Sequence, residues 1–122
     1  MKGKSIASIV LLCCTVVSCW HRRGDVSIQY SESEKYYSMD AWFQEDRTRA
    51  VEEYMDDKIG RRSNFSFVNT KVDGRVSLDD HTTFFIKKFP GHLRIKLDKR
   101  ENSTNNYREI KSLCEGIKEV VK

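Results

Sequence analysis

The chain of 122 residues carries 22 lysine and arginine residues, 18 aspartate and glutamate residues and four cysteines. Its net charge is +4, and without Lys2 and Lys4 it is 20 − 18 = +2, which is too mild to predict nucleic-acid binding, since that usually needs a strongly basic surface. Lys2 and Lys4 are the only charged residues among the first 18, and the rest of the chain is long enough for one domain but too short for two.

The first 18 residues have the three-part layout of a secretory signal peptide. Lys2 and Lys4 give a positive start, Ile6–Val17 is an unbroken weakly polar run, and Ser18 is small. As a helix this run would reach about 18 Å, whereas the hydrocarbon core of a bilayer is about 30 Å thick. We therefore predict a cleaved signal over residues 1–18. The alternative, a buried helix of a cytosolic protein, is disfavoured by the strongly polar residues 21–25 that follow.

The end of this segment, Val16-Val17-Ser18-Cys19, resembles the lipobox of bacterial lipoproteins, in which a branched, a variable and a small residue precede a cysteine. Leucine is the residue most often found where Val16 stands. The resemblance implies that Cys19 becomes the mature N-terminus and carries acyl chains, palmitate among them, that anchor it in a membrane. In the enterobacterial sorting pattern an Asp after the cysteine retains the protein in the inner membrane. Trp20 at that position favours the outer membrane, with the domain facing the periplasm.

A plain secretory signal cut before Cys19 is the alternative. The mature chain could then form a Cys19–Cys114 disulfide, and the glycosylation-type tripeptides at Asn64 and Asn102 would matter. With an acylated Cys19 both tripeptides are chance matches. Cys114 lies on the apolar stripe of the last helix, where we expect a small buried hydrophobe.

Residues 19–37 are rich in Ser, Glu, Arg and Tyr and are interpreted as a tether ahead of a domain over residues 38–122. Fully extended, residues 20–37 would span about 60 Å. Val26, Ile28 and Tyr30 alternate with polar residues, which also fits a short edge strand. Residues 23–25 (Arg-Gly-Asp) match the tripeptide of integrin ligands, but a solvated charge cluster is the preferred interpretation.

A helix is predicted next, over residues 38–59. Ser38 or Asp40 suits its N-cap, and Gly60 suits its C-terminal end. Apolar residues at helical spacing form one stripe, with Met39 or Trp42 at its start: Phe43, Ala50, Val51, Tyr54 and Ile59. The opposite face is charged. Acidic residues of this region form a possible contact surface of their own: Glu45, Asp46, Glu52, Glu53, Asp56 and Asp57.

The period then changes from helical to alternating, which predicts four strands near residues 65–68, 75–78, 82–88 and 92–98. Asp73-Gly74 is a strong signal for a two-residue hairpin turn, and Pro90-Gly91 marks another turn. Residues 92–98 alternate most cleanly. Leu93, Ile95 and Leu97 should face inward, while Arg94 and Lys96 face water.

A final helix is predicted after the polar loop 99–106, with Asn106 and Glu109 as its capping pair. Its apolar stripe should lie across the sheet: Tyr107, Ile110, Leu113, Cys114, Ile117, Val120 and Val121. The predicted fold class is therefore α+β, with an N-terminal helix, an antiparallel meander of about four strands, and an amphipathic C-terminal helix packed on one sheet face.

No catalytic, metal-binding or cofactor-binding motif stands out in the sequence. Asp79-Asp80-His81 is the one cluster of carboxylate and imidazole groups, and it lies between two predicted strands, where Asp typically supports a turn. His21 and His92 are isolated in sequence. There is no glycine-rich phosphate loop, zinc-ligand spacing or nucleophile elbow. We therefore expect no enzyme activity, no cofactor and no small-molecule substrate.

A basic stretch is the more informative feature. Six cations lie between residues 87 and 100, against Asp98 alone, and they are the candidate partner-binding residues: Lys87, Lys88, Arg94, Lys96, Lys99 and Arg100. Such a surface can attract an acidic protein or anionic lipid head groups, although ordinary solvated strand decoration also explains it. The expected function is that of a membrane-anchored periplasmic lipoprotein that binds a protein, of the immunity, exclusion or secretion-accessory type. An envelope hydrolase, a secreted protein without lipid and a structural envelope role are the alternatives.

Overall fold

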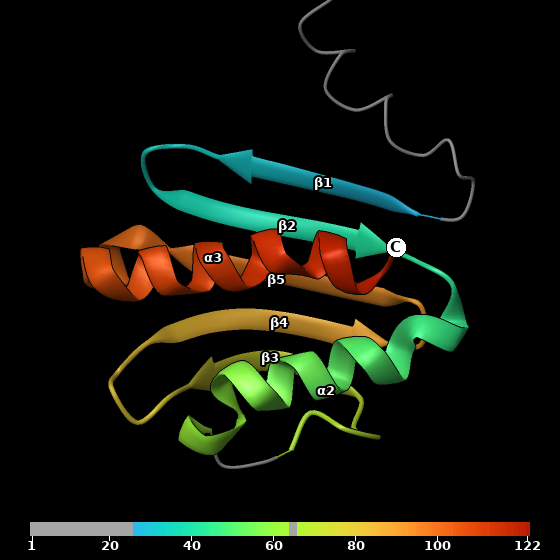
Figure 1. Ribbon diagram of the computed structural model, residues 1–122. Coiled ribbons are helices and arrows are strands. Elements are labelled where there is room, and N and C mark those ends of the chain that lie inside the picture. Colours follow the sequence, from blue (N-terminus) through green and yellow to red (C-terminus); the bar gives the residue numbers. More distant parts are fainter. Residues whose placement is uncertain (1–25, 64–65) are drawn as a thin grey trace, which may run out of the picture.

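The structure, a computed structural model, describes residues 26–63 and 66–122. Five strands form one antiparallel sheet in the order β1-β2-β5-β4-β3 (Figure 1). The signal segment, Cys19, the Arg-Gly-Asp tripeptide and Asn64 lie outside the described residues. The α+β class and the C-terminal helix that contacts the sheet are therefore as predicted.

Along the chain, a two-stranded hairpin is followed by a helix, a three-stranded meander and a second helix. In chain order they are β1 (Ser27–Glu32), β2 (Tyr36–Trp42), α2 (Thr48–Ile59), β3 (Val72–Ser77), β4 (Thr83–Phe89), β5 (His92–Asp98) and α3 (Thr104–Val120). Short 3-10 turns precede α2, follow it and precede α3, at Glu45–Arg47, Gly60–Arg62 and Lys99–Glu101. The β3-β4-β5 meander is as predicted, and the β1-β2 hairpin extends the sheet on the other side of β5.

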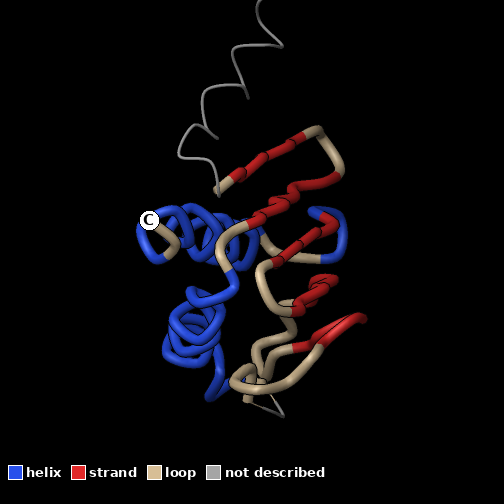
Figure 2. The backbone as a smooth tube through the Cα atoms, turned by 90° about the vertical axis from the view of Figure 1, so that its right-hand side faces the viewer, coloured by secondary structure: helices blue, strands red, loops and turns tan. Residues whose placement is uncertain are grey.

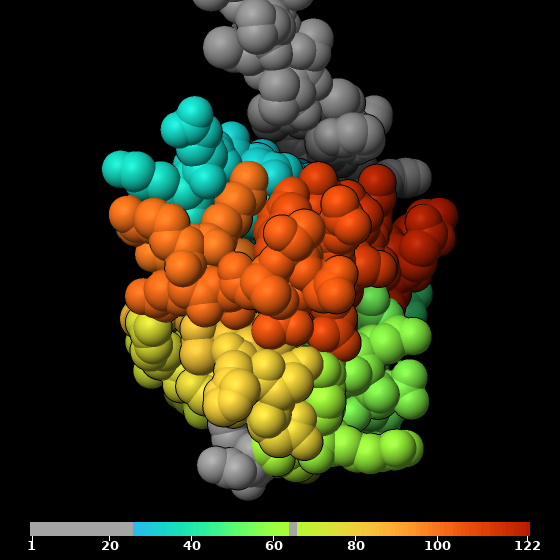
Figure 3. Space-filling view, turned by 90° about the vertical axis from the view of Figure 1, so that its left-hand side faces the viewer, coloured from blue at the N-terminus to red at the C-terminus, as the bar shows by residue number. Residues whose placement is uncertain are grey.

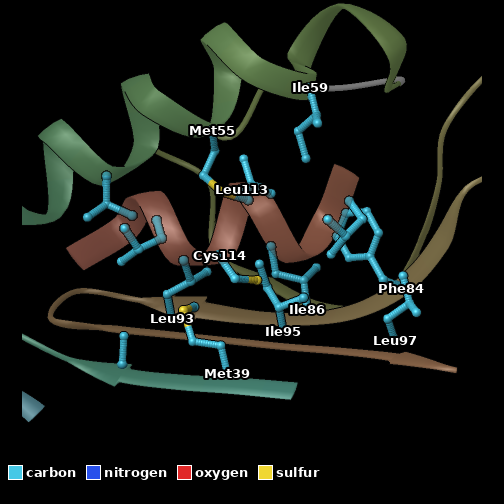
Figure 4. Packing of buried hydrophobic residues seen from close by; sticks show 14 of the residues in the cluster. Met39, Met55, Ile59, Phe84, Ile86, Leu93, Ile95, Leu97, Leu113 and Cys114 are labelled. Atoms are coloured by element: carbon cyan, nitrogen blue, oxygen red, sulfur yellow. The ribbon is translucent and has the colours of Figure 1, made fainter. Parts of the chain in front are cut away.

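Both helices lie on the same side of the sheet (Figure 2). The alternation of β5 explains this arrangement, because Leu93, Ile95 and Leu97 are fully buried while Arg94 and Lys96 are exposed. Met39, Ile86 and Ile95 of three neighbouring strands point toward Met55 of α2 and Cys114 of α3 (Figure 4). The hydrophobic core is therefore a single layer between the sheet and the two helices.

Cys114 lies in the middle of this core, where it is completely buried. Burial raises the pKa of its thiol, and the nearby Glu115 carboxylate raises it further. The prediction of a small buried hydrophobe at this position is confirmed. The apolar stripe of α3 is also as predicted, since Ile110, Leu113 and Ile117 are buried with it.

The predicted helix over residues 38–59 is wrong for its first part. Residues 36–42 form β2, and the helix α2 begins only at Thr48. Tyr37, Met39 and Ala41 alternate with less buried neighbours, and β2 is hydrogen-bonded to β1 on one side and β5 on the other. Pairing on both sides therefore overrides the local helical spacing that Met39 and Trp42 shared with the residues after them. The helix is consequently a mid-chain element and not an N-terminal one.

The predicted tether over residues 19–37 is also shorter than expected. Ser27–Glu32 is an edge strand, as the alternation of Val26, Ile28 and Tyr30 indicated, and Tyr36 begins the next strand. Ile28 is buried in the common core, and the Tyr30 hydroxyl donates to the carbonyl of Cys114 at 3.3 Å. The folded unit therefore begins no later than β1, and not at residue 38.

The strand predicted at residues 65–68 is absent from the part of it that the structure describes. Residues 66–71 are irregular, and Phe67 is buried with its backbone N–H donating to the Asp56 carboxylate at 2.6 Å. The hairpin turn predicted at Asp73-Gly74 is wrong as well, because both residues lie inside β3 opposite β4. The β3-β4 connection is the Asp79-Asp80-His81 segment, as predicted, and β4 turns into β5 at the predicted Pro90-Gly91, where Gly91 has a φ of 82°.

The N-terminus of α3 is capped by Ser103, whose hydroxyl accepts from the N–H of Asn106 at 3.0 Å. This corrects the predicted Asn106 and Glu109 pair. The preceding Asn102 donates its side-chain amide to the carbonyls of Thr83 and Asp98. The fold therefore uses the amide that a glycan would need, which agrees with a chance match to the glycosylation pattern.

Glu32 ties the edge hairpin to the start of α3, which lie against each other in Figure 3. Hydrogen bonds from Lys99, at 2.7 Å, and from the Tyr107 hydroxyl lower the pKa of Glu32 to about 2, and Lys111 adds to the effect. The outermost strand is thus held by polar contacts at its exposed end as well as by the burial of Ile28.

Candidate functional site

The face of the sheet that neither α2 nor α3 covers is the candidate site (Figure 2). It consists of the side chains that alternate with the core residues along β2 to β5, and it is called the open face below. Its central members, placed side by side by the strand register, are Asp40, Trp42, His92, Arg94, Lys96, Phe85, Lys87, Phe89, Asp73 and Arg75. Tyr36 lies on the same side at the start of β2.

Two large aromatic side chains stand out on the open face. Trp42 is 48% exposed and Phe85 is 50% exposed, which are the highest values among the large hydrophobic residues of the described chain. Trp42 packs on the His92 ring at 3.9 Å between centroids and meets Phe89 edge-on at 6.0 Å. Because the fold leaves these rings in water, it keeps apolar area available that a partner could bury.

His92 is held rigidly beneath Trp42. Its ring is stacked on Phe89 at 4.8 Å, and its Nε2 lies 2.7 Å from Oδ1 of Asp40. Its Nδ1 is buried and has no hydrogen-bond partner among the residues that the structure describes. A carboxylate and an imidazole can form an acid–base pair, yet here one ring nitrogen is occupied by Asp40 and the other is enclosed. The His92 and Asp40 pair therefore fits a structural role, holding the aromatic cluster in place, better than a catalytic one.

Three of the six predicted basic residues come together on the open face. Arg94 and Lys96 project from β5, and Lys87 projects from β4 directly opposite Arg94. Lys96 also lies over the Tyr36 ring, with its Nζ 4.5 Å from the centroid. The cations therefore surround the exposed aromatic rings and do not form a separate patch.

Arg100 lies at the margin of the open face, over the Tyr36 ring at 5.3 Å. Its guanidinium donates to the Asp98 carboxylate at 2.8 and 2.9 Å. These hydrogen bonds raise the pKa of Arg100 and lower the pKa of Asp98. Arg100 thus reaches a partner only as half of an ion pair.

The other two predicted basic residues lie elsewhere. Lys88 points to the helix side of the sheet, where it is 3% exposed and its Nζ donates to Glu52 of α2 at 2.7 Å. Lys99 pairs with Glu32, also away from the open face. Lys88 and Lys99 therefore stabilise the fold, and the prediction that they belong to one binding surface with the other four is corrected.

The acidic residues of the first predicted helix are likewise divided. Glu52 is buried with Lys88, Asp56 accepts from the Ser66 hydroxyl and the Phe67 N–H, and Glu53 pairs with Arg49 at 3.0 Å. Half of the possible acidic surface is therefore engaged within the domain.

The Asp79-Asp80-His81 cluster is a turn, as interpreted from the sequence. Asp80 accepts from the Thr82 hydroxyl and N–H, which lowers the pKa of its carboxyl, and it also pairs with Arg62 at 2.7 Å. His81 adopts a φ of 71°. Within residues 26–63 and 66–122, no three His, Cys, Asp or Glu side chains gather in a way that could hold a metal ion.

Sequence reasoning missed the aromatic part of the site. Trp42 was assigned to a helix, and the contact between His92 and Asp40 joins residues 52 positions apart in the chain. The signal for Phe85 was present, because it alternates with the inward Phe84 and Ile86 on β4.

Comparisons with known proteins found no similar protein with which the site could be compared. The sequence matches no protein-family model, no curated protein and no solved structure. Among the described residues, none of the helices is long and apolar enough to span a bilayer.

Proposed function

We propose that this protein is a lipid-anchored bacterial lipoprotein that acts by binding a protein partner through the open face of its sheet. One observation carries the proposal: Trp42 and Phe85 are each about half exposed (48% and 50%) on the uncovered side of the sheet, beside exposed cations. Trp, Tyr and Arg are the residues that dominate binding energy at protein interfaces, and charged neighbours around an apolar centre favour specific docking.

The location of the partner follows from the anchor. The signal segment and the lipobox-like sequence ending at Cys19 support attachment to a membrane of the cell envelope. Trp20 favours the outer membrane with the domain in the periplasm. Immunity to a secreted toxin, exclusion of incoming genetic elements and service to a secretion machine are the roles that need only local binding.

The alternatives are less well supported. An envelope hydrolase that used His92 and Asp40, the buried imidazole and its carboxylate partner, would need an accessible ring nitrogen, and neither ring nitrogen of His92 is open to a reactant. A secreted form with a Cys19–Cys114 disulfide would need a thiol that is completely buried between α3 and the sheet. A lipid-anchored binding protein is therefore better supported than a hydrolase or a secreted, disulfide-bonded form.

The anchor is tested by replacing Cys19 with alanine. We expect Cys19→Ala to lose incorporation of labelled palmitate and to leave the membrane fraction or accumulate unprocessed, because the acylated thiol is gone. Cys13→Ala and Cys14→Ala are matched controls, since both residues lie in the segment that processing removes, and both should mature normally. Normal labelling and membrane retention of Cys19→Ala would refute the lipoprotein proposal.

The binding face is tested by photocrosslinking in cells. A photoreactive residue at position 85 should capture a protein that the same residue at position 53, an exposed site on α2, does not. The captured protein is identified, purified and titrated against wild type and Phe85→Ala. We expect the Kd to rise by roughly 30-fold, the effect of losing one aromatic hot spot.

Arg49→Ala is the control for this titration, because Arg49 is exposed on α2 and its ion-pair partner among the described residues is Glu53. Its Kd should stay within about twofold of wild type. Equal capture at positions 53 and 85, or an unchanged Kd for Phe85→Ala, would contradict binding through the open face.

A further inference from the structure

Arg94 and Lys87 form an unusual pair at the centre of the open face. They are direct register partners on β5 and β4, and both are exposed. Like charges placed directly opposite each other on neighbouring strands repel and destabilise a sheet. Among the residues that the structure describes, neither cation has a carboxylate within ion-pair distance. The fold therefore places two like charges opposite each other without an ion pair to either of them within the described residues.

Other arginines on this side of the sheet are neutralised. Arg75 pairs with Glu101 at 2.5 Å, and Arg100 pairs with Asp98 at 2.8 Å. The nearest acidic neighbours of the central pair are Asp40, opposite Arg94, and Asp73, opposite Lys87. Asp40 is already engaged by His92 at 2.7 Å, and Asp73 lies on the edge strand.

Aromatic rings border the cation pair on both sides along the strands. The His92 and Phe89 pair, with Trp42 packed on it, precedes Arg94 on β5, and the Lys96 and Phe85 pair follows. A small negative group set between Arg94 and Lys87 would thus have apolar rings on two sides, where a charge-assisted hydrogen bond is stronger than in open water.

We infer that the partner inserts a single aspartate or glutamate carboxylate between Arg94 and Lys87, so that an isolated acidic side chain of the partner meets the centre of the open face. This inference rests on the proposed function and names the chemistry of the partner. A carboxylate has two oxygens, and it can accept from the guanidinium and the ammonium together. Asp40 and Asp73 flank the cations on either side, and they would repel a phosphate chain or a lipid head-group layer that continued past the pair.

The test compares wild type with Arg94→Gln/Lys87→Gln. The probe is a fluorescent peptide with a single glutamate between leucine residues, read by anisotropy at low salt, with a glutamine-for-glutamate peptide as the blank. Wild type should bind the acidic peptide with an affinity that falls as salt is added, and the variant should bind at least about tenfold more weakly. The Tm of the variant should stay close to that of wild type, because both side chains are exposed and neither forms an ion pair within the described residues.

Arg49→Gln/Lys118→Gln is the matched control, since it removes two exposed cations from α2 and α3 on the other side of the sheet, and its affinity should change by less than about threefold. A single-stranded oligothymidine and phosphatidylglycerol vesicles form the other arms of the experiment. Tighter binding of either one than of the peptide, no binding of the peptide, or an undiminished affinity in Arg94→Gln/Lys87→Gln would overturn the inference.

The two proposals fail separately. If the peptide experiment fails while crosslinking at position 85 still captures a protein in a Phe85-dependent way, the open face binds a partner of different chemistry. If the crosslinking fails as well, the open face is not the binding surface.

Discussion

Lys88→Met is expected to lower the free energy of unfolding by about 3 to 5 kcal/mol. The Lys88 ammonium and the Glu52 carboxylate are 2.7 Å apart, with side chains only 3% and 7% exposed. Removing the lysine alone leaves a carboxylate buried between α2 and β4 without its counter-charge. Glu52 also accepts from the backbone N–H of Asn69 at 3.1 Å, so the loop that precedes β3 should loosen together with the helix.

Urea denaturation followed by circular dichroism measures this effect, and a double variant provides the control. Lys88→Met/Glu52→Gln removes both charges but keeps an oxygen for the N–H of Asn69. It should recover at least half of the lost stability, because the double variant no longer buries a charge without its counter-charge. A loss below about 1 kcal/mol in the single variant, or no recovery in the double variant, would show that the pair is not the buried contact described here.

Ile95→Ala is the second change with a large expected effect, a loss of about 2 to 5 kcal/mol. Ile95 is fully buried on the central strand β5, where it faces both helices. Its truncation leaves a cavity that Met39 and Ile86, its register partners on either side, are too constrained to fill.

The neighbouring residue supplies the comparison. Arg94→Ala changes the next side chain along the same strand, which points to the open face, and its stability should stay within about 0.5 kcal/mol of wild type. Thermal and urea unfolding of the two variants, measured side by side, decide the matter. Similar losses for both, or a larger loss for Arg94→Ala, would contradict the assignment of one face to the core and the other to binding.

The elements with one clean period could be predicted from the sequence. The alternation of β5 and the apolar stripe of α3 each had a single structural interpretation, and both are confirmed. Residues 36–42 fit two structural interpretations. Met39 and Trp42 fit a helical stripe, while Tyr37, Met39 and Ala41 fit a strand. Pairing with β1 and β5 decided between them, and such long-range pairing is not visible in local spacing.

The candidate site shows the same division. Arg94, Lys96 and Lys87 could be placed on the surface from strand alternation alone. The same reasoning, applied to β4, puts Lys88 on the side of Phe84 and Ile86. The burial of Lys88 could therefore be predicted from alternation, but the prediction grouped it with the other basic residues between 87 and 100. The contact between His92 and Asp40 had none, since it depends on β2 lying beside β5.

Strand β1 also limits where the domain can work. With an anchor at Cys19, only residues 20–26 separate the acylated position from the sheet, and even a fully extended chain of that length reaches no more than about 25 Å. That is less than half of the reach expected for a tether running to residue 37. The domain would then stay close to the bilayer surface. A partner that binds the open face would have to come close to that surface as well.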